Sequence, residues 1–119
     1  MPKRRQGWEP DTHPGHYLIT ESDDDGVTWV CVEARYKGRL LDNPQTVHDT
    51  LVLENRLKND ALRVIGGALP PWFDPEIIAW DMGAIDGKVA LTVPGVTDDV
   101  LNMLREVASA HFGSDVTVG

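Results

Sequence analysis

The stretch that decides the fold runs from Glu76 to Val93 and reads EIIAWDMGAIDGKVALTV. Its Asp86-Gly87 pair stands between two segments that alternate apolar and polar residues, which is a strong signal for a β-hairpin with a two-residue turn. Gly83 leaves an alternative open, because a bulge at a strand glycine would shift the far end of the pairing. The turn otherwise predicts one continuous apolar face, in which the opposed residues are Trp80 and Val93, Met82 and Leu91, and Ala84 and Val89.

An amphipathic helix is expected directly after this hairpin. Pro94-Gly95 ends the strand, and Thr97 is a candidate N-cap ahead of two aspartates that complement the positive end of the helix dipole. Gly113 is placed to end the helix, and residues 115–118 can form a short last strand. The apolar side of this helix is predicted to hold Val100, Leu101, Met103, Leu104, Val107, Ala108, His111 and Phe112.

A second helix is predicted ahead of the hairpin, over residues 46–66. Pro44 stops the preceding extended segment, and Thr46 with Asp49 is a capping pair typical of a helix start. The Gly66-Gly67 pair is expected to end the helix.

Two charged residues fall inside the apolar arc of that helix. Glu54 and Lys58 lie four residues apart, in the order that favours an ion pair along a helix. One interpretation is an ordinary surface pair at the point where the helix leaves its sheet. The other is a pair that a partner chain covers.

Residues 1–16 are predicted to form an extended basic arm, because their prolines and glycines disfavour any regular element. A β-hairpin is expected next, with strands at 17–21 and 27–34 and an acidic loop at 22–26. The second strand carries apolar residues on both sides. It is therefore predicted to be a central strand that is covered on both faces.

The elements in chain order read ββαββαβ, and this order predicts the α+β class. We expect an antiparallel or mixed sheet of four to five strands, with two helices packed on one face. The chain has 119 residues, of which 41% are hydrophobic, so a single domain over residues 17–119 is expected after the arm.

Charge and cysteine content narrow the class of protein. The chain carries 11 Lys and Arg against 19 Asp and Glu, a net charge of −8, and an acidic body disfavours broad nucleic-acid binding. Its single cysteine, Cys31, cannot form an internal disulfide, and we expect it to be a buried, inert thiol. With no long apolar run and no signal-peptide pattern, the expected location is the cytoplasm, or an assembly formed there, with no membrane partner.

Two groups of residues resemble metal ligands without completing a site, so no metal and no cofactor is expected. Glu21, Asp23 and Asp25 imitate the start of a calcium loop, but Val32 stands where a bidentate glutamate is needed. The other group is the pair His13 and His16, with Asp11 nearby, on a proline and glycine turn that makes a poor frame for zinc.

Catalysis is not expected either, because no nucleophile carries a local signature. His48 and His111 are predicted to be capping or packed histidines. An alternative that stays open is a small hydrolase or isomerase that uses His111 and carboxylates. The acidic candidates near the hairpin are Asp74, Glu76, Asp81 and Asp86.

A basic strip supports a second alternative, a nucleic-acid-associated protein. Arg35, Lys37 and Arg39 alternate, so they would point to one side if the strand continued past residue 34, with Tyr36 opposite. Such charges also protect an edge strand from unwanted pairing.

The expected function is that of a non-enzymatic protein-binding accessory or assembly subunit, for example a component of a bacteriophage particle. Tryptophan is enriched at interface hot spots, and Trp8 and Trp72 stand in segments that normally lie on a surface. They either cap the chain's own sheet or anchor a protein partner or a second copy. The residues predicted to bind that partner are Trp8, Leu69, Trp72 and Phe73, together with the cations Lys3, Arg4, Arg5, Arg35, Lys37 and Arg39.

Overall fold

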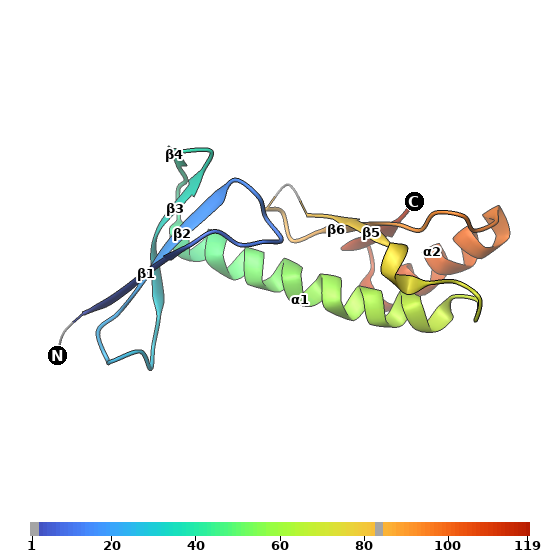
Figure 1. Ribbon diagram of the computed structural model, residues 1–119, viewed down its shortest axis with the longest axis horizontal. Helices are drawn as coiled ribbons and strands as arrows, with labels where there is room; N and C mark the ends of the chain where they lie inside the picture. The colour runs from blue at the N-terminus through green and yellow to red at the C-terminus, as the bar shows by residue number, and fades with distance from the viewer. Residues whose placement is uncertain (1–2, 83–84) are drawn as a thin grey trace. The chain divides into compact units, whose positions relative to one another are not determined.

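The computed structural model describes residues 3–82 and 85–119, and Figure 1 labels most of its helices and strands. Contacts divide the chain into two compact units, one up to Val52 and one from Leu53 onward. A single domain over residues 17–119 stays a prediction. In chain order the elements are β1 (Arg4–Trp8), β2 (His16–Ser22), β3 (Val30–Tyr36), β4 (Arg39–Leu40), α1 (Pro44–Ala68), the short 3-10 helix η1 (Pro75–Ile77), β5 (Ala79–Asp81), β6 (Val89–Thr92), α2 (Asp98–Phe112) and β7 (Val116–Val118).

The predicted α+β class is confirmed, with helices that pack against sheet. The strands form two sheets, whereas we expected one. The first sheet is antiparallel in the order β1-β2-β3-β4, and the second is mixed in the order β5-β6-β7. β1 and β4 are absent from the expected order. They pair with the two edges of the β2–β3 hairpin, so this hairpin completes a sheet within its own unit.

The β2–β3 hairpin itself is confirmed, but a β-bulge changes which of its residues are buried. The register of β3 against β2 skips Val32, so Cys31 and Ala34 are both buried although they are three residues apart. Val30 and Val32 are exposed instead. The expectation that β3 is central is therefore confirmed, and the expectation that both of its faces are covered is wrong.

Part of the predicted arm is a strand. Residues Arg4–Trp8 pair with β2 as β1, so the expectation that the arm holds no regular element is wrong there. The prolines do not prevent this strand, because two of them lie in the connection from β1 to β2. Within β1 itself stands Gly7, which the ring of Tyr17 crosses so closely that a Cβ atom would overlap the tyrosine hydroxyl.

Helix α1 is longer than predicted, because it spans Pro44–Ala68. Proline is tolerated in the first turn of a helix, where its missing N–H needs no partner, so the start expected at Thr46 is two residues late. Asn43 turns the chain into the helix with a φ of 53°, and its carbonyl accepts a hydrogen bond from the Val47 N–H at 3.1 Å. The helix continues through Gly66-Gly67.

In the second sheet, β5 pairs with β6 antiparallel and β6 pairs with β7 parallel. The hairpin between β5 and β6 is confirmed, but its register differs from the predicted one by two residues. Trp80 pairs with Leu91 where Val93 was expected. The Asp86 carboxylate accepts a hydrogen bond from the Lys88 N–H at 3.0 Å, and the connection is longer than the two-residue turn that we predicted.

A shift of two residues keeps each side chain on its own side of a strand, so the predicted apolar face survives the change in register. Met82, Val89, Leu91 and Val93 are all buried in one cluster. The predicted pairing of Ala84 and the alternative of a bulge at Gly83 lie outside the described residues.

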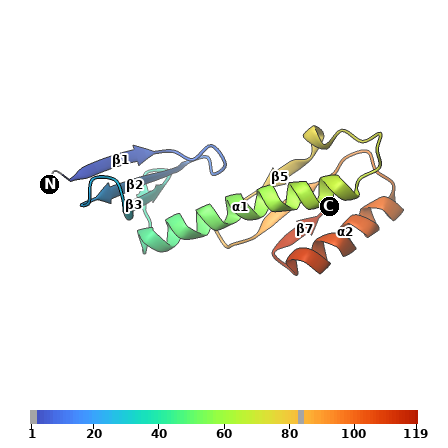
Figure 2. The same ribbon diagram turned by 90° about the horizontal axis from the view of Figure 1, so that it is seen from below.

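Helix α2 has the predicted caps. The Thr97 hydroxyl accepts a hydrogen bond from the Val100 N–H at 3.3 Å, and Gly113 ends the helix with a φ of 61°. The predicted last strand is confirmed as β7, beside which α2 runs (Figure 2). His111 was predicted on the apolar side but is exposed, although the next residue, Phe112, packs against the core.

The core of the second unit lies between one face of its sheet and both helices, as predicted. Val89 and Leu91 of β6 and Val116 and Val118 of β7 are buried, while the residues between them are exposed. The helices contribute buried residues to the same cluster, namely Ala61 and Ile65 of α1 and Leu104 and Ala108 of α2.

Candidate interaction surfaces

The segment 69–73 connects α1 to η1, and it divides between core and surface. A turn forms where the Phe73 N–H donates to the Pro70 carbonyl at 3.0 Å. Phe73 is buried in the core of the second unit, and Leu69 packs against that core. Trp72 keeps 71% of its surface exposed and meets the Phe73 ring edge to face, at 6.0 Å between ring centroids. Of these predicted partner-binding residues, Trp72 is therefore the accessible one.

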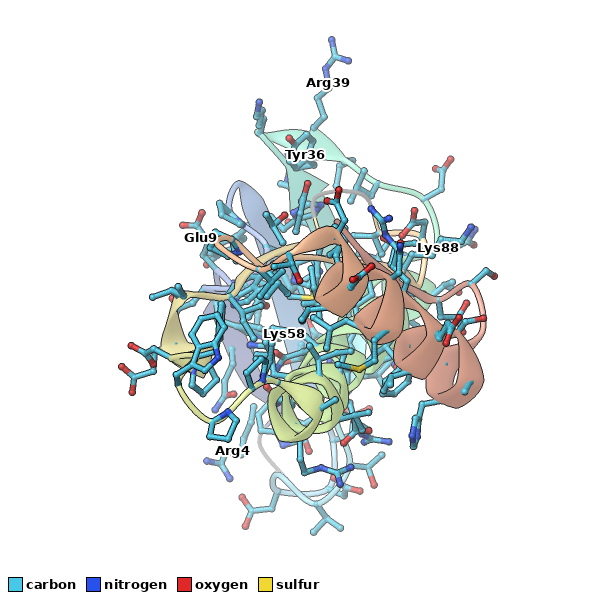
Figure 3. The ribbon with its side chains drawn as sticks, turned by 90° about the vertical axis from the view of Figure 1, so that its right-hand side faces the viewer. Arg4, Glu9, Tyr36, Arg39, Lys58 and Lys88 are labelled. Carbon is cyan, nitrogen blue, oxygen red and sulfur yellow. The ribbon has the colours of Figure 1, made fainter. Side chains whose placement is uncertain are left out.

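Exposed apolar surface continues along the chain after Trp72. Ile77 of η1 is 52% exposed, and Trp80 of β5 is 38% exposed. The Lys58 ammonium of α1, labelled in Figure 3, lies over the Trp80 ring at 4.6 Å from its centroid. The sequence predicted Trp80 on the covered apolar face of a longer hairpin. It did not reveal that β5 is an edge strand of three residues.

The cations of the N-terminal segment are bound by the chain's own acids. Lys3 and Arg5 lie 3.1 Å and 3.5 Å from the Glu21 carboxylate, and Arg4 lies 3.9 Å from that of Asp25. The hydrogen bond to Glu21 raises the pKa of Lys3 above its usual value. These contacts neutralise much of the charge that was predicted to reach a partner.

Trp8 lies on the covered side of its sheet. Its cross-strand partner is Leu18, which is fully buried, and residues opposed in this way share a face. The indole also meets His48 edge to face, at 6.4 Å between ring centroids. Trp8 thus contributes to the packing of the first unit.

The basic strip is divided by a turn, so its three cations do not line one strand. β3 ends at Tyr36, and both Lys37 and Gly38 have positive φ, which reverses the chain into β4. Arg35 lies 3.1 Å from the Glu33 carboxylate, and Lys37 lies 5.3 Å from the Tyr36 ring centroid. Arg39 is exposed, and Figure 3 shows it extending away from the ribbon. The expectation that these cations point to one side is therefore wrong, because the Lys37-Gly38 turn separates them.

The acidic loop organises itself by hydrogen bonds. The Asp24 carboxylate accepts from the Ser22 hydroxyl and from the Thr28 N–H, both at 2.7 Å. The backbone hydrogen bond from Thr28 lowers the pKa of Asp24 to about 2. Asp23 and Asp25 instead take part in the ion pairs with Lys3 and Arg4.

The histidine pair and the cysteine are buried. The rings of His13 and His16 meet edge to face with 6.0 Å between centroids, and His16 stacks on Tyr36 at 4.5 Å. Burial raises the pKa of the Cys31 thiol, so it stays protonated at neutral pH. Within residues 3–82 and 85–119, no three His, Cys, Asp or Glu side chains are grouped closely enough to hold a metal ion.

Glu54 is a fully buried acid on α1, beneath the connection between β5 and β6. Burial, together with the negative charge of Asp86, raises its pKa to about 7, although a hydrogen bond from the Gly87 backbone opposes the rise. One interpretation of the sequence was that a partner chain covers Glu54. The β5–β6 connection of the same chain accounts for its burial. Lys58, the residue that the sequence predicted to pair with Glu54 along the helix, lies over the Trp80 ring.

Sequence reasoning missed one surface entirely, the open face of the first sheet. We define the open face by its exposed and half-buried apolar residues, which are Tyr17, Ile19, Val30, Val32 and Leu40. A hollow of about 470 Å³ adjoins it, lined by Val30, Val32 and residues of the acidic loop. The apolar residues at 30 and 32 are the signal that could have revealed this face, but the bulge that exposes them is not visible in the sequence.

Comparisons with protein-family models, with curated proteins and with solved structures find no match. Among the residues that the structure describes, neither helix is long and apolar enough to cross a membrane.

Proposed function

We propose that this chain is a protein-binding accessory or assembly subunit that works without catalysis. The observation that carries the proposal is the 71% exposure of Trp72. A tryptophan buries a large area when it docks, and such residues dominate the binding energy of many interfaces.

The backbone around Trp72 supports this role because the turn orders it before any partner arrives. The turn between Pro70 and Phe73 sets the direction of the chain, and the buried Phe73 ring anchors it. A segment whose backbone is already ordered loses less conformational entropy on binding.

The neighbouring residues resemble the rim of an interface. Asp74 and Glu76 are exposed acids beside the exposed Ile77. Together with the net charge of −8, they favour a partner with a basic surface, which the acidic chain would attract over a distance that salt shortens.

Three more specific expectations stay predictions. They are a subunit of a bacteriophage particle that docks through its basic arm, a cytoplasmic location, and partner contacts by Trp8 and the cations at 3–5 and 35–39. The nucleic-acid and enzyme alternatives have no observation here that favours them over protein binding.

Site-specific photo-crosslinking tests the proposal. A benzophenone amino acid in place of Trp72, in the full chain expressed in its source cells, is expected to form a covalent adduct with another protein. The same photo-crosslinker in place of Ser114, an exposed polar residue between α2 and β7, serves as the matched control and should give no such adduct.

Two results would contradict the proposal. One is the absence of any adduct from position 72 at normal expression. The other is an adduct that nuclease treatment abolishes, because it would indicate nucleic acid as the partner.

A further inference from the structure

The open face of the first sheet carries several exposed apolar side chains among charged ones, where a solvent-facing side is usually polar throughout. The cross-strand register places Tyr17 opposite Arg35, and Arg35 opposite Leu40, so these residues share one side of the sheet. Tyr17, Val30 and Val32 keep 45%, 49% and 43% of their surface exposed. An antiparallel sheet that is covered on one face normally turns polar side chains outward on the other.

The charged residues on this side of the sheet are Arg5, Glu21, Glu33 and Arg35, and they form ion pairs within the chain. Lys3 and Arg5 share the Glu21 carboxylate, whose side chain is only 17% exposed as a result. On β3, Arg35 binds Glu33 at 3.1 Å. The open face is therefore close to neutral, although the chain as a whole carries a charge of −8.

The near-neutral charge of the open face favours one kind of binding partner. A strongly charged partner gains little from a face whose charges are already matched. Two copies of an acidic chain repel each other over most of their surface. The repulsion between two copies is smallest at a face whose charges are paired, and the apolar side chains on this face offer area whose burial offsets the rest.

We propose that the open face binds the open face of a second copy of this chain. The contact is isologous, with the same residues contributed by both copies about a two-fold axis. Two antiparallel sheets pack in this way at about 10 Å, with their apolar side chains interleaved. This proposal concerns residues other than Trp72 and does not depend on the protein-binding role proposed for that residue.

The size of the face sets the expected affinity. Neighbouring strands lie about 4.8 Å apart and each residue advances about 3.4 Å, so strands of this length present a few hundred Å² on one side. A standard interface buries roughly 800 Å² per partner. The dimer is therefore expected to exchange with monomer, with a dissociation constant on the order of micromolar.

Sedimentation equilibrium of the full chain tests the proposal. From about 1 to about 500 µM, wild-type protein is expected to pass from monomer to dimer. Val32→Glu places an unpaired negative charge in each copy's half of the contact, so about a tenfold or larger rise in the dissociation constant is expected. The matched control is Val27→Glu, the same substitution at a loop valine that is 83% exposed, and it should dimerise like wild type.

Salt provides a second measurement. Moving from about 0.05 to about 0.5 M salt is expected to tighten the dimer, because screening reduces the repulsion between two acidic chains. Val32→Thr keeps the shape and strand preference of valine, so it provides a milder variant if Val32→Glu fails to fold. A partial loss of affinity is expected for it.

The proposal is overturned if wild-type protein stays monomeric over the whole concentration range. It is equally overturned by a dimer that neither Val32 variant weakens, or by one that salt dissociates, because either result assigns the contact to another surface.

Discussion

Replacing Leu104 with alanine is expected to lower the free energy of unfolding by about 3 kcal/mol. Leu104 is fully buried on α2, in the cluster where both helices meet the second sheet. Removing its branched side chain loses the transfer free energy of the missing carbons and leaves a cavity that a close-packed core fills only partly. Urea denaturation followed by circular dichroism measures the change.

The matched control is Leu53→Ala on α1. It is the same substitution in a helix, so both variants gain alike from the helix preference of alanine, but Leu53 is 53% exposed. Its cost is expected to stay below about 1 kcal/mol. Equal losses in the two variants would mean that Leu104 does not belong to the core.

Local signals predicted the second unit well. The Thr97 cap and the terminal Gly113 of α2 act on residues within one turn of themselves, so the sequence around them is sufficient to predict the helix. The alternation of apolar residues around Leu91 likewise predicted the buried side of β6. The register was missed because it depends on the length of the connection, which the Asp86-Gly87 signal suggested was shorter than it is.

Features that depend on distant parts of the chain were not predictable from pattern alone. β1 forms because β2 offers an open edge, and its own residues, which include Gly7, show no strand signal. The bulge at Val32 reverses which side of β3 faces the interior, so the open face was mistaken for core.

The candidate surfaces also depend on contacts that the sequence pattern does not show. The sequence identified the 69–73 segment as unusual, but only the turn at Pro70 separates the exposed Trp72 from the buried Phe73. The sequence also suggested that Arg4 and Arg5 were free to meet a partner. Arg5 instead pairs with Glu21, its cross-strand partner on β2, and Arg4 pairs with Asp25 of the acidic loop.

Glu54 makes the stability of this protein depend on pH. The carboxyl group is fully buried, and its pKa rises from 4.5 to about 7 in the folded chain. Below pH 4.5 the carboxyl is protonated in the folded and unfolded states alike, so it does not disfavour folding. As pH rises toward about 7, the unfolded chain releases this proton more readily, and stability falls. The loss is complete above pH 7 and amounts to about 3 kcal/mol.

Glu54→Gln removes this dependence. The amide has nearly the same shape, and its oxygen still accepts a hydrogen bond, but it carries no charge at any pH. The stability of the variant relative to wild type is therefore expected to rise by about 3 kcal/mol between pH 4.5 and pH 8. Urea denaturation at a series of pH values measures this difference.

Glu106→Gln on α2 is the matched control, because Glu106 is an exposed helical glutamate. Its stability relative to wild type should stay level over the same pH range. The buried charge of Glu54 also repels Asp86, so Asp86→Asn is expected to reduce the pH dependence of the wild-type chain without removing it. The contrary result is a difference in the free energy of unfolding between Glu54→Gln and wild type that does not change from pH 4.5 to pH 8. It would show that the Glu54 carboxyl ionises as it does in water and is not enclosed beneath the β5–β6 connection.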